Sequence, residues 1–455
     1  MNHRLLITAL LFTGCAAPNP LTTVSSMSPL DGPPVKIEGS PRNAPMSPRE
    51  AVAEAGTLSG DFSLQLAMDI ARTNSIQVLR ASDAHLRATA DVRIVHSETF
   101  YPHLSAGAQT GRVRGQVQAT GGDLDDVNKE NANVGIALRF DLDLATATHG
   151  IDAARESLRA TSWDWVAAEL AAETTAALLY HDLLEAGAWV EIAESAVDRA
   201  RAYHALAEAR FQAGAGLEAD VLRALAHLAE ARQQRVEALA ARGRTSTLMA
   251  ELLGLDPILP LEPTDSLEPR DLVGEVAELN LATHPALEAS RARVAAMEAK
   301  VREDGARRYL PELILDAGLN DFGDEFGDLA NHRSLTAAIS WDLSPSILAH
   351  ADRSKADLLR AKHDEEAETR RIESALVRAQ ISALATDELL EATQTRVEAS
   401  RAAVGLERTR HEAGDALLIE LLDAEVSLLR AETASAAAIC SHNRAQHLLR
   451  QALGG

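Results

Sequence analysis

The sequence has few aromatic residues: phenylalanine, tryptophan and tyrosine make up 3% of its 455 residues, although 46% of the residues are hydrophobic. Alanine and leucine supply most of this apolar content, and both residue types favour helices. Alanine side chains are also small enough to let neighbouring helices approach closely. The composition therefore predicts a chain that is mostly helical.

An excess of basic residues is also absent, since the formal net charge is −23. Nucleic-acid binding requires a basic surface that neutralises phosphates, so the charge argues against a nucleic-acid partner. The same charge argues against an anionic lipid headgroup surface as the main partner.

Cysteine is nearly absent, and the two cysteines, Cys15 and Cys440, are too few for a disulfide framework. Cys440 lies in alanine-rich sequence, and we expect it to be a small buried apolar residue. The HExxH, GxSxG, GxxxxGK and CxxC motifs do not occur in the sequence. We therefore expect that the protein is not an enzyme and that it holds no cofactor.

The histidines show no spacing that is typical of metal ligands. His103 and His411 could contact a metal, but no second ligand is suitably spaced in the sequence. His181 and His363 each precede an aspartate inside long predicted helices, and we expect both pairs to lie on the surface. The sequence therefore predicts no metal site.

Residues 1–15 resemble a bacterial lipoprotein signal. A short basic start is followed by an apolar run that is too short to span a bilayer. The run ends in "LFTGC", which predicts a covalent lipid such as palmitate on Cys15, although leucine is more usual than Phe12 at that position. Ala16, in place of aspartate, favours the outer membrane. The alternative is an ordinary cleaved signal peptide, and in either case the protein leaves the cytoplasm.

Proline marks the segments that connect folded parts. Of the 16 prolines, eight lie between Pro18 and Pro48, among many serines. This composition predicts an extended tether over residues 16–60. Four more prolines cluster in a stretch that predicts a linker over residues 257–275.

Two long stretches, residues 145–213 and 346–453, contain no proline at all. A continuous helix over the first stretch would be roughly 100 Å long. Helices of this length need partners along their whole length, and the sequence is rich in alanine, leucine, glutamate and arginine. These features predict a coiled-coil-like bundle.

The sequence repeats itself at an offset of 200 residues. "FQAGAGLEADVLRALAHLAEAR", from Phe211, matches "HEAGDALLIELLDAEVSLLRAE", from His411. Gly214 and Gly216 interrupt the first long helix, Gly414 interrupts the second, and another helical segment follows each interruption. Each repeat therefore contains the tip of a long antiparallel helical hairpin. The two repeats are placed at residues 61–256 and 276–455.

Each repeat also contains two segments that alternate between apolar and polar residues, as strands with one apolar face and one wet face do. "NVGIALRFDLDL", from Asn133, and "SLTAAISWDL", from Ser334, alternate without interruption. In the first strand the apolar phase switches near Gly111, which indicates a possible bulge. Polar loops are expected within each pair. The four expected strands are residues 102–118, 133–144, 311–320 and 334–343.

Four such strands cannot close into a barrel, and a bilayer does not tolerate open strand edges. We expect several chains to give four strands each to one shared barrel, with the apolar face toward lipid and the wet face lining a lumen. Phe140 and Trp341 lie near strand ends, where an interfacial aromatic belt would place them. The scarcity of aromatic residues makes such a belt thin.

The repeated tips around Gly214 and Gly414 resemble the paired tip signatures of the TolC-like outer-membrane efflux protein family. "THPALEASRARVAAMEAKVREDGARRYLPEL" resembles the opening of the family's second half. "FDLDLATATHGIDAARESLRAT" resembles its junction of strand and long helix, although the usual "DGG"-like turn is absent. The resemblance covers about residues 60–455, and the lipoprotein signal is similar to that of the lipidated branch.

The resemblance implies a mostly helical fold with some β-structure, assembled as a homotrimer. Three chains would form a twelve-stranded barrel, surrounded by outer-membrane lipid, and a long helical tunnel that extends into the periplasm. The implied function is a passive outer-membrane channel of a tripartite efflux system. Such a channel opens when a periplasmic adaptor protein and an inner-membrane transporter engage its helix tips.

The resemblance also implies an acidic constriction near the second tip. The family's acidic residues match Glu420 and Asp423, which lie at i and i+3 on one helix face. Six carboxylates from three copies would attract cations and repel anions. Asp220, the counterpart of Glu420 in the first repeat, is a third candidate, and Arg223 is spaced to pair with it. The alternative is an ordinary solvated helix face.

A second class of function stays open from the residues alone. A non-conducting structural lipoprotein, a scaffold of helical hairpins in the outer membrane, would share the lipid anchor and the long helices. Four strands with one apolar face favour the channel, because a non-conducting scaffold would not require such strands. The thin aromatic belt favours the scaffold.

Overall fold

The computed structural model describes most of the chain. Cys15 and the expected tether at residues 16–60 lie outside the described residues, as does residue range 272–280 of the expected linker. Within the described part, no helix combines the length and the apolar character needed to cross a membrane. The described residues are 62–118, 124–271, 281–323, 329–341 and 344–455.

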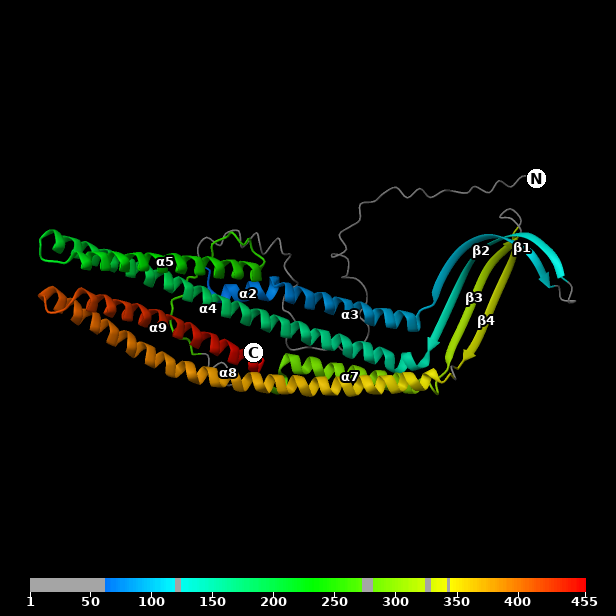
Figure 1. Ribbon diagram of the computed structural model, residues 1–455. Coiled ribbons are helices and arrows are strands. Elements are labelled where there is room, and N and C mark those ends of the chain that lie inside the picture. The colour runs from blue at the N-terminus through cyan, green and yellow to red at the C-terminus, as the bar shows by residue number, and fades with distance from the viewer. Residues whose placement is uncertain (1–61, 119–123, 272–280, 324–328, 342–343) are drawn as a thin grey trace. The chain divides into compact units, whose positions relative to one another are not determined.

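Helices predominate, and the strands form one antiparallel sheet (Figure 1). The helices are α2 (Leu64–Asn74), α3 (Ile76–Phe100), η2 (Thr146–Gly150), α4 (Ile151–Gln212), α5 (Glu218–Leu253), η3 (Leu281–Thr283), α7 (Pro285–Ala306), α8 (Ser346–Ala413) and α9 (Leu418–Leu453). The strands are β1 (His103–Gln118), β2 (Leu124–Asp143), β3 (Glu312–Gly323) and β4 (Leu329–Ser340).

Both halves of the chain follow the same order of elements. The first half runs through α3, β1, β2, α4 and α5, and the second through α7, β3, β4, α8 and α9. The long helices α4 and α8 contain 62 and 68 residues, which corresponds to about 90 Å and 100 Å. Each packs against the helix that follows it, α5 or α9, so that two antiparallel hairpins form (Figure 1). This packing gives each long helix the partner that its length requires.

Glycines form the turns at the hairpin tips. Gly214 and Gly414 have φ values of 73° and 86°, in the left-handed region that residues with a Cβ avoid. The backbone of Gly216 is not in the left-handed region. A Cβ at Gly216 would instead lie 3.1 Å from the Arg210 Cβ and the Phe211 nitrogen, so close approach of the chain requires glycine there.

Alanine in place of Gly414 should lower the free energy of unfolding by about 1–2 kcal/mol, because the left-handed backbone becomes strained. The matched control is Gly405→Ala in the interior of α8, where an added Cβ meets nothing within 4 Å. That change should raise the same free energy by about 0.5–1 kcal/mol. Thermal unfolding of both variants tests the pair, and equal effects of one sign would contradict the assigned backbone.

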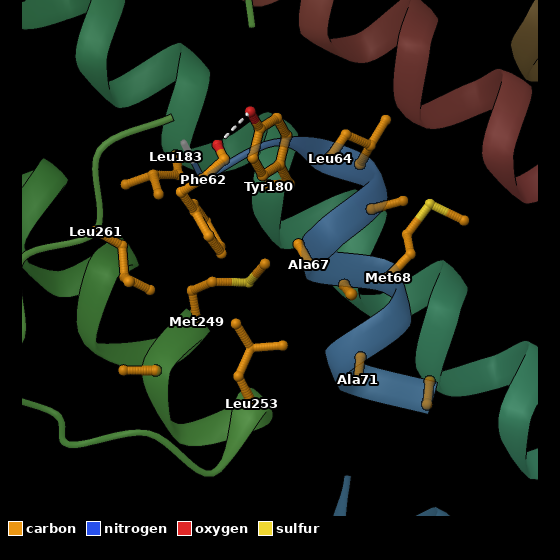
Figure 2. Close-up of a cluster of buried hydrophobic side chains, with 14 of the residues drawn as sticks. Phe62, Leu64, Ala67, Met68, Ala71, Tyr180, Leu183, Met249, Leu253 and Leu261 are labelled. Atoms are coloured by element: carbon orange, nitrogen blue, oxygen red, sulfur yellow. Dashed lines mark hydrogen bonds between the residues drawn. The ribbon is translucent and has the colours of Figure 1, made fainter. Parts of the chain in front are cut away.

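The main hydrophobic core joins α2, α4, the end of α5 and the segment after α5 (Figure 2). The Tyr180 hydroxyl of α4 lies 2.7 Å from Asp265 Oδ2 and 3.0 Å from the Phe62 carbonyl, and these two acceptors share its single hydrogen. Met249 and Leu253 are fully buried beneath the Phe62 ring. The core therefore attaches the connecting segment to α4 at mid-length.

Two predictions about single residues had different outcomes. Cys440 is fully buried in the main core, as expected, and burial raises the pKa of its thiol to about 12. The prediction that His181 lies on the surface is wrong, since only 1% of it is exposed. His181 packs against His447 of α9, with ring centroids 5.4 Å apart. The other predicted surface histidine, His363, is exposed.

The sheet has the strand order β1-β2-β3-β4, and every neighbouring pair is antiparallel (Figure 1). Strand β2 begins at Leu124, well before the expected residue 133, so part of the expected polar loop is strand. Strand β4 ends at Ser340, earlier than the expected residue 343. The bulge expected near Gly111 is wrong, because β1 pairs residue for residue with β2 from His103 to Gln118.

The pairing places the apolar faces of all four strands on one side of the sheet. Leu138 lies opposite both Leu104 and Ala317, and Ala317 lies opposite Leu335. The other side is largely polar. Its residues include His103, Gln109, Asn133, Arg139, Asp141, Asp316, Asn320, His332, Ser334 and Thr336.

Candidate functional site

The predicted acidic residues lie just beyond the second hairpin tip. Glu420 is in the first turn of α9 and Asp423 follows one turn later, and both side chains are exposed. Within the described part of this chain, neither carboxylate has a hydrogen-bonded or ion-paired partner. A negative charge in the first turn also interacts favourably with the helix dipole. Their position leaves both carboxylates free to face a pore or a solvated surface.

The third candidate, Asp220, has a different environment at the first tip. Arg223 donates a hydrogen bond from Nη1 to Asp220 Oδ1 at 3.1 Å, and this is the pair that the spacing suggested. The guanidinium compensates the carboxylate charge locally. Asp220 therefore contributes less free negative charge than Glu420 and Asp423 do.

A hydrogen bond that the sequence did not predict joins the two tips. Arg210 at the end of α4 donates from Nη1 to His411 Nε2 of α8 at 2.8 Å. Arginine can only donate, so Nε2 must accept and the ring proton lies on Nδ1. Nδ1 is 3.0 Å from the Ala416 carbonyl, to which it then donates. This arrangement requires a neutral His411 and links the hairpin of the first half to that of the second.

A buried acid, farther from the tips, also connects the hairpin of the first half to that of the second. Glu425 of α9 is 4% exposed and accepts a hydrogen bond from the Tyr203 hydroxyl at 2.6 Å and one from Arg199 Nε at 2.9 Å. Both donors belong to α4. Burial, reinforced by the hydrogen bond to Glu425, raises the pKa of Tyr203. In the cluster of Arg199, Tyr203 and Glu425, here called the α4–α9 latch, each carboxylate oxygen of Glu425 therefore accepts one hydrogen bond.

A sequence signal for this latch was present. The buried face of α9 contains Leu418, Leu421, Leu422 and Leu428 at helical spacing, and Glu425 lies within that apolar stripe. A charge at such a position requires a buried partner. The residue 200 positions earlier is a leucine, so the acid also departs from the repeat. The partners on α4 could not be inferred, because they depend on how two distant helices pack.

The two hairpin tips therefore combine free negative charge with contacts that join the hairpins. Glu420 and Asp423 supply free negative charge, while the latch and the Arg210–His411 contact hold the two hairpins together. Among the described residues, no group of three or more histidine, cysteine, aspartate or glutamate side chains is arranged to hold a metal ion. Carboxylates without a partner, such as those of Glu420 and Asp423, attract cations and repel anions.

Comparison with known families gives a match over most of the chain. The family described as "Outer membrane efflux protein" matches residues 67–255 and 276–455. A similar relative is the pyoverdine export outer membrane protein OpmQ of Pseudomonas putida, which is 28% identical over 413 residues. The match covers 85% of this chain and 85% of OpmQ. Protein CyaE of Bordetella pertussis is 29% identical over 268 residues, 57% of this chain and 54% of that protein.

Solved structures resemble the chain over a similar extent. The outer-membrane channel OprN is 26% identical, with a TM-score of 0.71, and the match covers 86% of this chain and 90% of OprN. The CmeC outer membrane channel of Campylobacter jejuni has a TM-score of 0.76 at 17% identity, covering 86% of this chain and 85% of CmeC. At that identity the second likeness shows the fold alone.

Proposed function

Because the chain belongs to the outer membrane efflux protein family, we propose that three copies assemble into the complete outer-membrane channel of a tripartite efflux system. The function of the chain is that of an outer-membrane efflux channel, and the alternative of a scaffold without a pore is not supported by the comparisons. The observation that carries the proposed assembly is the sheet, with one apolar face and with two edges, β1 and β4, that have no partner strand among the described residues.

The apolar face has the height that a membrane barrel needs. On β2 it extends from Val134 to Leu142, and transmembrane strands tilted by about 45° use roughly 9–11 residues to cross the hydrocarbon layer. Open edges are not stable in lipid, so pairing of β4 with β1 of the next copy would satisfy both edges. Three copies would give twelve strands, an even number as in bacterial barrels.

The hairpins would form the tunnel and its periplasmic entrance. In a trimer, Glu420 and Asp423 would bring six carboxylates to one ring, while each α4–α9 latch would hold its two hairpins together. The exposed Leu217 and Leu417 at the tips, 67% and 68% exposed, support docking of a periplasmic adaptor protein. An inner-membrane transporter would supply the energy.

The lipid anchor belongs to the same proposal. A covalent lipid on Cys15 would hold the chain at the outer membrane before and after assembly. Cys15 follows the apolar run of the signal after Thr13 and Gly14. Mass spectrometry of the purified protein should find the acylated cysteine as its first residue, whereas an unmodified residue 16 at the N-terminus would contradict lipidation.

Conductance across a planar bilayer tests the channel and its acidic ring together. Wild-type trimers should conduct weakly and prefer cations, since a ring of carboxylates attracts them. Replacing Glu420 by glutamine and Asp423 by asparagine should abolish that preference or raise the conductance. The matched control is Glu388→Gln with Glu391→Gln, which removes two exposed carboxylates at the same spacing from the middle of α8.

The possible outcomes test the channel and the acidic ring separately. Loss of cation preference in the Glu420 and Asp423 variant alone supports both the channel and the ring. Equal selectivity in all three proteins would keep the channel and contradict the assignment of the ring. Intact trimers that conduct in none of the three forms would contradict a passive duct.

A further inference from the structure

Three arginines lie on the apolar side of the sheet, beyond the end of the apolar residues that is farther from the helices. On β1 the face continues from Ala108 past Thr110 to Arg112 and Arg114. On β4 it continues from Leu335 to Arg333. Strand alternation and the pairing register put these arginines on the same side of the sheet as the apolar residues. We call these three residues the arginine rim.

The border between the apolar face and the rim crosses the sheet obliquely. On β1 the last apolar residue is Ala108, which lies opposite Val134, and on β2 one further small residue, Ala132, continues the face. On β3 the last is Leu319, which pairs with Ile136, two residues nearer the helices. On β4 the last is Leu335, whose row contains Leu138, again two residues nearer.

This slope agrees with the tilt of strands in a membrane barrel. The border shifts by about four residues of 3.3 Å over three strand spacings of about 4.8 Å, which corresponds to a slope of roughly 40–45°. Barrel strands tilt by about 35–45° from the membrane normal. The border is therefore parallel to the membrane plane when the strands are tilted in this way. Arg333 is the first residue of the face beyond it on β4, and Arg112 and Arg114 are the second and third on β1.

Barrel closure would bring the rim together at each seam between copies. Arg333 is on β4 and the other two arginines are on β1, and these are the two free edges of the sheet. When β4 of one copy pairs with β1 of the next, Arg333 would lie at the same seam as Arg112 and Arg114 of the neighbouring copy, beyond the apolar residues. Three such clusters would surround the barrel.

The guanidinium groups of the rim are only partly satisfied by the protein. Arg112 and Arg114 both donate from Nε to Asn128 Oδ1, at 3.2 Å and 3.0 Å. Arg112 also has Glu130 at 3.6 Å, with both side chains about half exposed. In the described part of the chain, Arg114 and Arg333 have no carboxylate partner, and both are exposed. Two of the three guanidinium groups of the rim, those of Arg114 and Arg333, are therefore without a carboxylate contact, while Asp321 of β3 lies at the border on the same face.

We propose that the arginine rim binds the phosphate groups of a phosphorylated glycolipid in the outer leaflet of the membrane, at each seam between copies. The inference rests on the proposed function, because it needs the closed barrel. The planar fork of arginine matches phosphate in a bidentate way, and the apolar residues directly below the rim would contact the acyl chains of the same lipid. The ligand of the arginine rim would be a lipid of the surrounding membrane and not the cargo of the channel.

Native mass spectrometry of the detergent-purified full chain, titrated with diphosphoryl lipid A, tests this proposal. The comparison lipid is lipid A without its phosphates, and inorganic phosphate at millimolar concentration is the competitor. The test variant replaces Arg112, Arg114 and Arg333 by glutamine. The matched control is Arg139→Gln, which removes an arginine from the opposite face of the same sheet, where it pairs with Asp141 at 2.8 Å.

We expect wild type and the Arg139 variant to retain lipid A equally, and the triple variant to bind it roughly tenfold or more weakly. Lipid A without phosphates should bind weakly to all three proteins, and inorganic phosphate should not displace the lipid. Equal binding by the triple variant, equal binding of the phosphate-free lipid, or displacement by inorganic phosphate would overturn the proposal. Masses of monomers alone would overturn the closed barrel itself, and the seam site with it.

Discussion

Replacing Glu425 with alanine should lower the free energy of unfolding by about 1–3 kcal/mol, because it leaves the buried Tyr203 hydroxyl and the partly exposed Arg199 guanidinium without their acceptor. Arg199 and Tyr203 both donate to this carboxylate, at 2.9 Å and 2.6 Å. Tyr203 is 8% exposed and the Arg199 side chain 30%, so water can reach the guanidinium more easily than the tyrosine hydroxyl. Denaturant unfolding of the purified protein measures the change.

Two variants separate the latch from a general effect of charge removal. Glu412→Ala removes an exposed glutamate of α8 that pairs with Arg408 at 3.1 Å, and it should cost about 0–1 kcal/mol. Converting the whole latch to apolar residues, with Arg199→Met, Tyr203→Phe and Glu425→Leu, should restore stability close to wild type. If Glu425→Ala were as stable as Glu412→Ala, the latch would contribute nothing.

The same substitution should increase the conductance of the channel. The latch joins α4 of the first hairpin to α9 of the second, so its loss should let the hairpins separate more easily at the entrance. Conductance of Glu425→Ala above that of Glu412→Ala in the same bilayer would support this role. Equal conductance would restrict the latch to stability.

Acidification from pH 7.5 to 5.5 should lower the free energy of unfolding by about 3 kcal/mol through two buried histidines. Burial lowers the pKa of His181 to about 3 and that of His447 to about 4, below the value near 6.5 of an unfolded chain. The neutral forms therefore favour the folded state. Their contribution is complete above pH 6.5 and is lost as the pH falls below it. The charged residues that face the pair are Arg270, Arg444, Arg450 and Asp265.

The control for this prediction is a variant without the two rings. Neither ring nitrogen of His181 has a hydrogen-bond partner, so leucine should be tolerated at this position. His181→Leu with His447→Leu should remove most of the loss between pH 7.5 and 5.5, whereas His363→Leu, at an exposed position of α8, should retain it. Melting temperatures across this pH range measure the difference. A double variant with an unchanged pH profile would assign the acid sensitivity to other groups.

The helical part of the fold could be predicted closely because its causes are local. The absence of proline from residues 145–213 and 346–453 allows two very long helices, and α4 and α8 occupy these stretches. The glycines at 214 and 414 supply the left-handed backbone at which each helix reverses. These features depend on neighbouring residues only.

The strand ends and the bulge were less predictable because they depend on pairing. Residues 124–131 are polar and were expected to be loop, yet they form strand because β1 is long enough to pair with them. The change of apolar phase near Gly111 is not a bulge. It marks the place where the sheet extends beyond its apolar band, as Arg112 and Glu130 on the former apolar face show.

The sequence by itself determined the family, the helical hairpins and the alternating strands, since each is encoded in a contiguous stretch. The role of Glu420 and Asp423 stays a prediction of the same kind. Only the tertiary structure decided the rest. The α4–α9 latch, the buried His181–His447 pair and the arginine rim each combine residues from separate elements. Their burial and charge balance depend on which helices and strands become neighbours, and no local pattern specifies that.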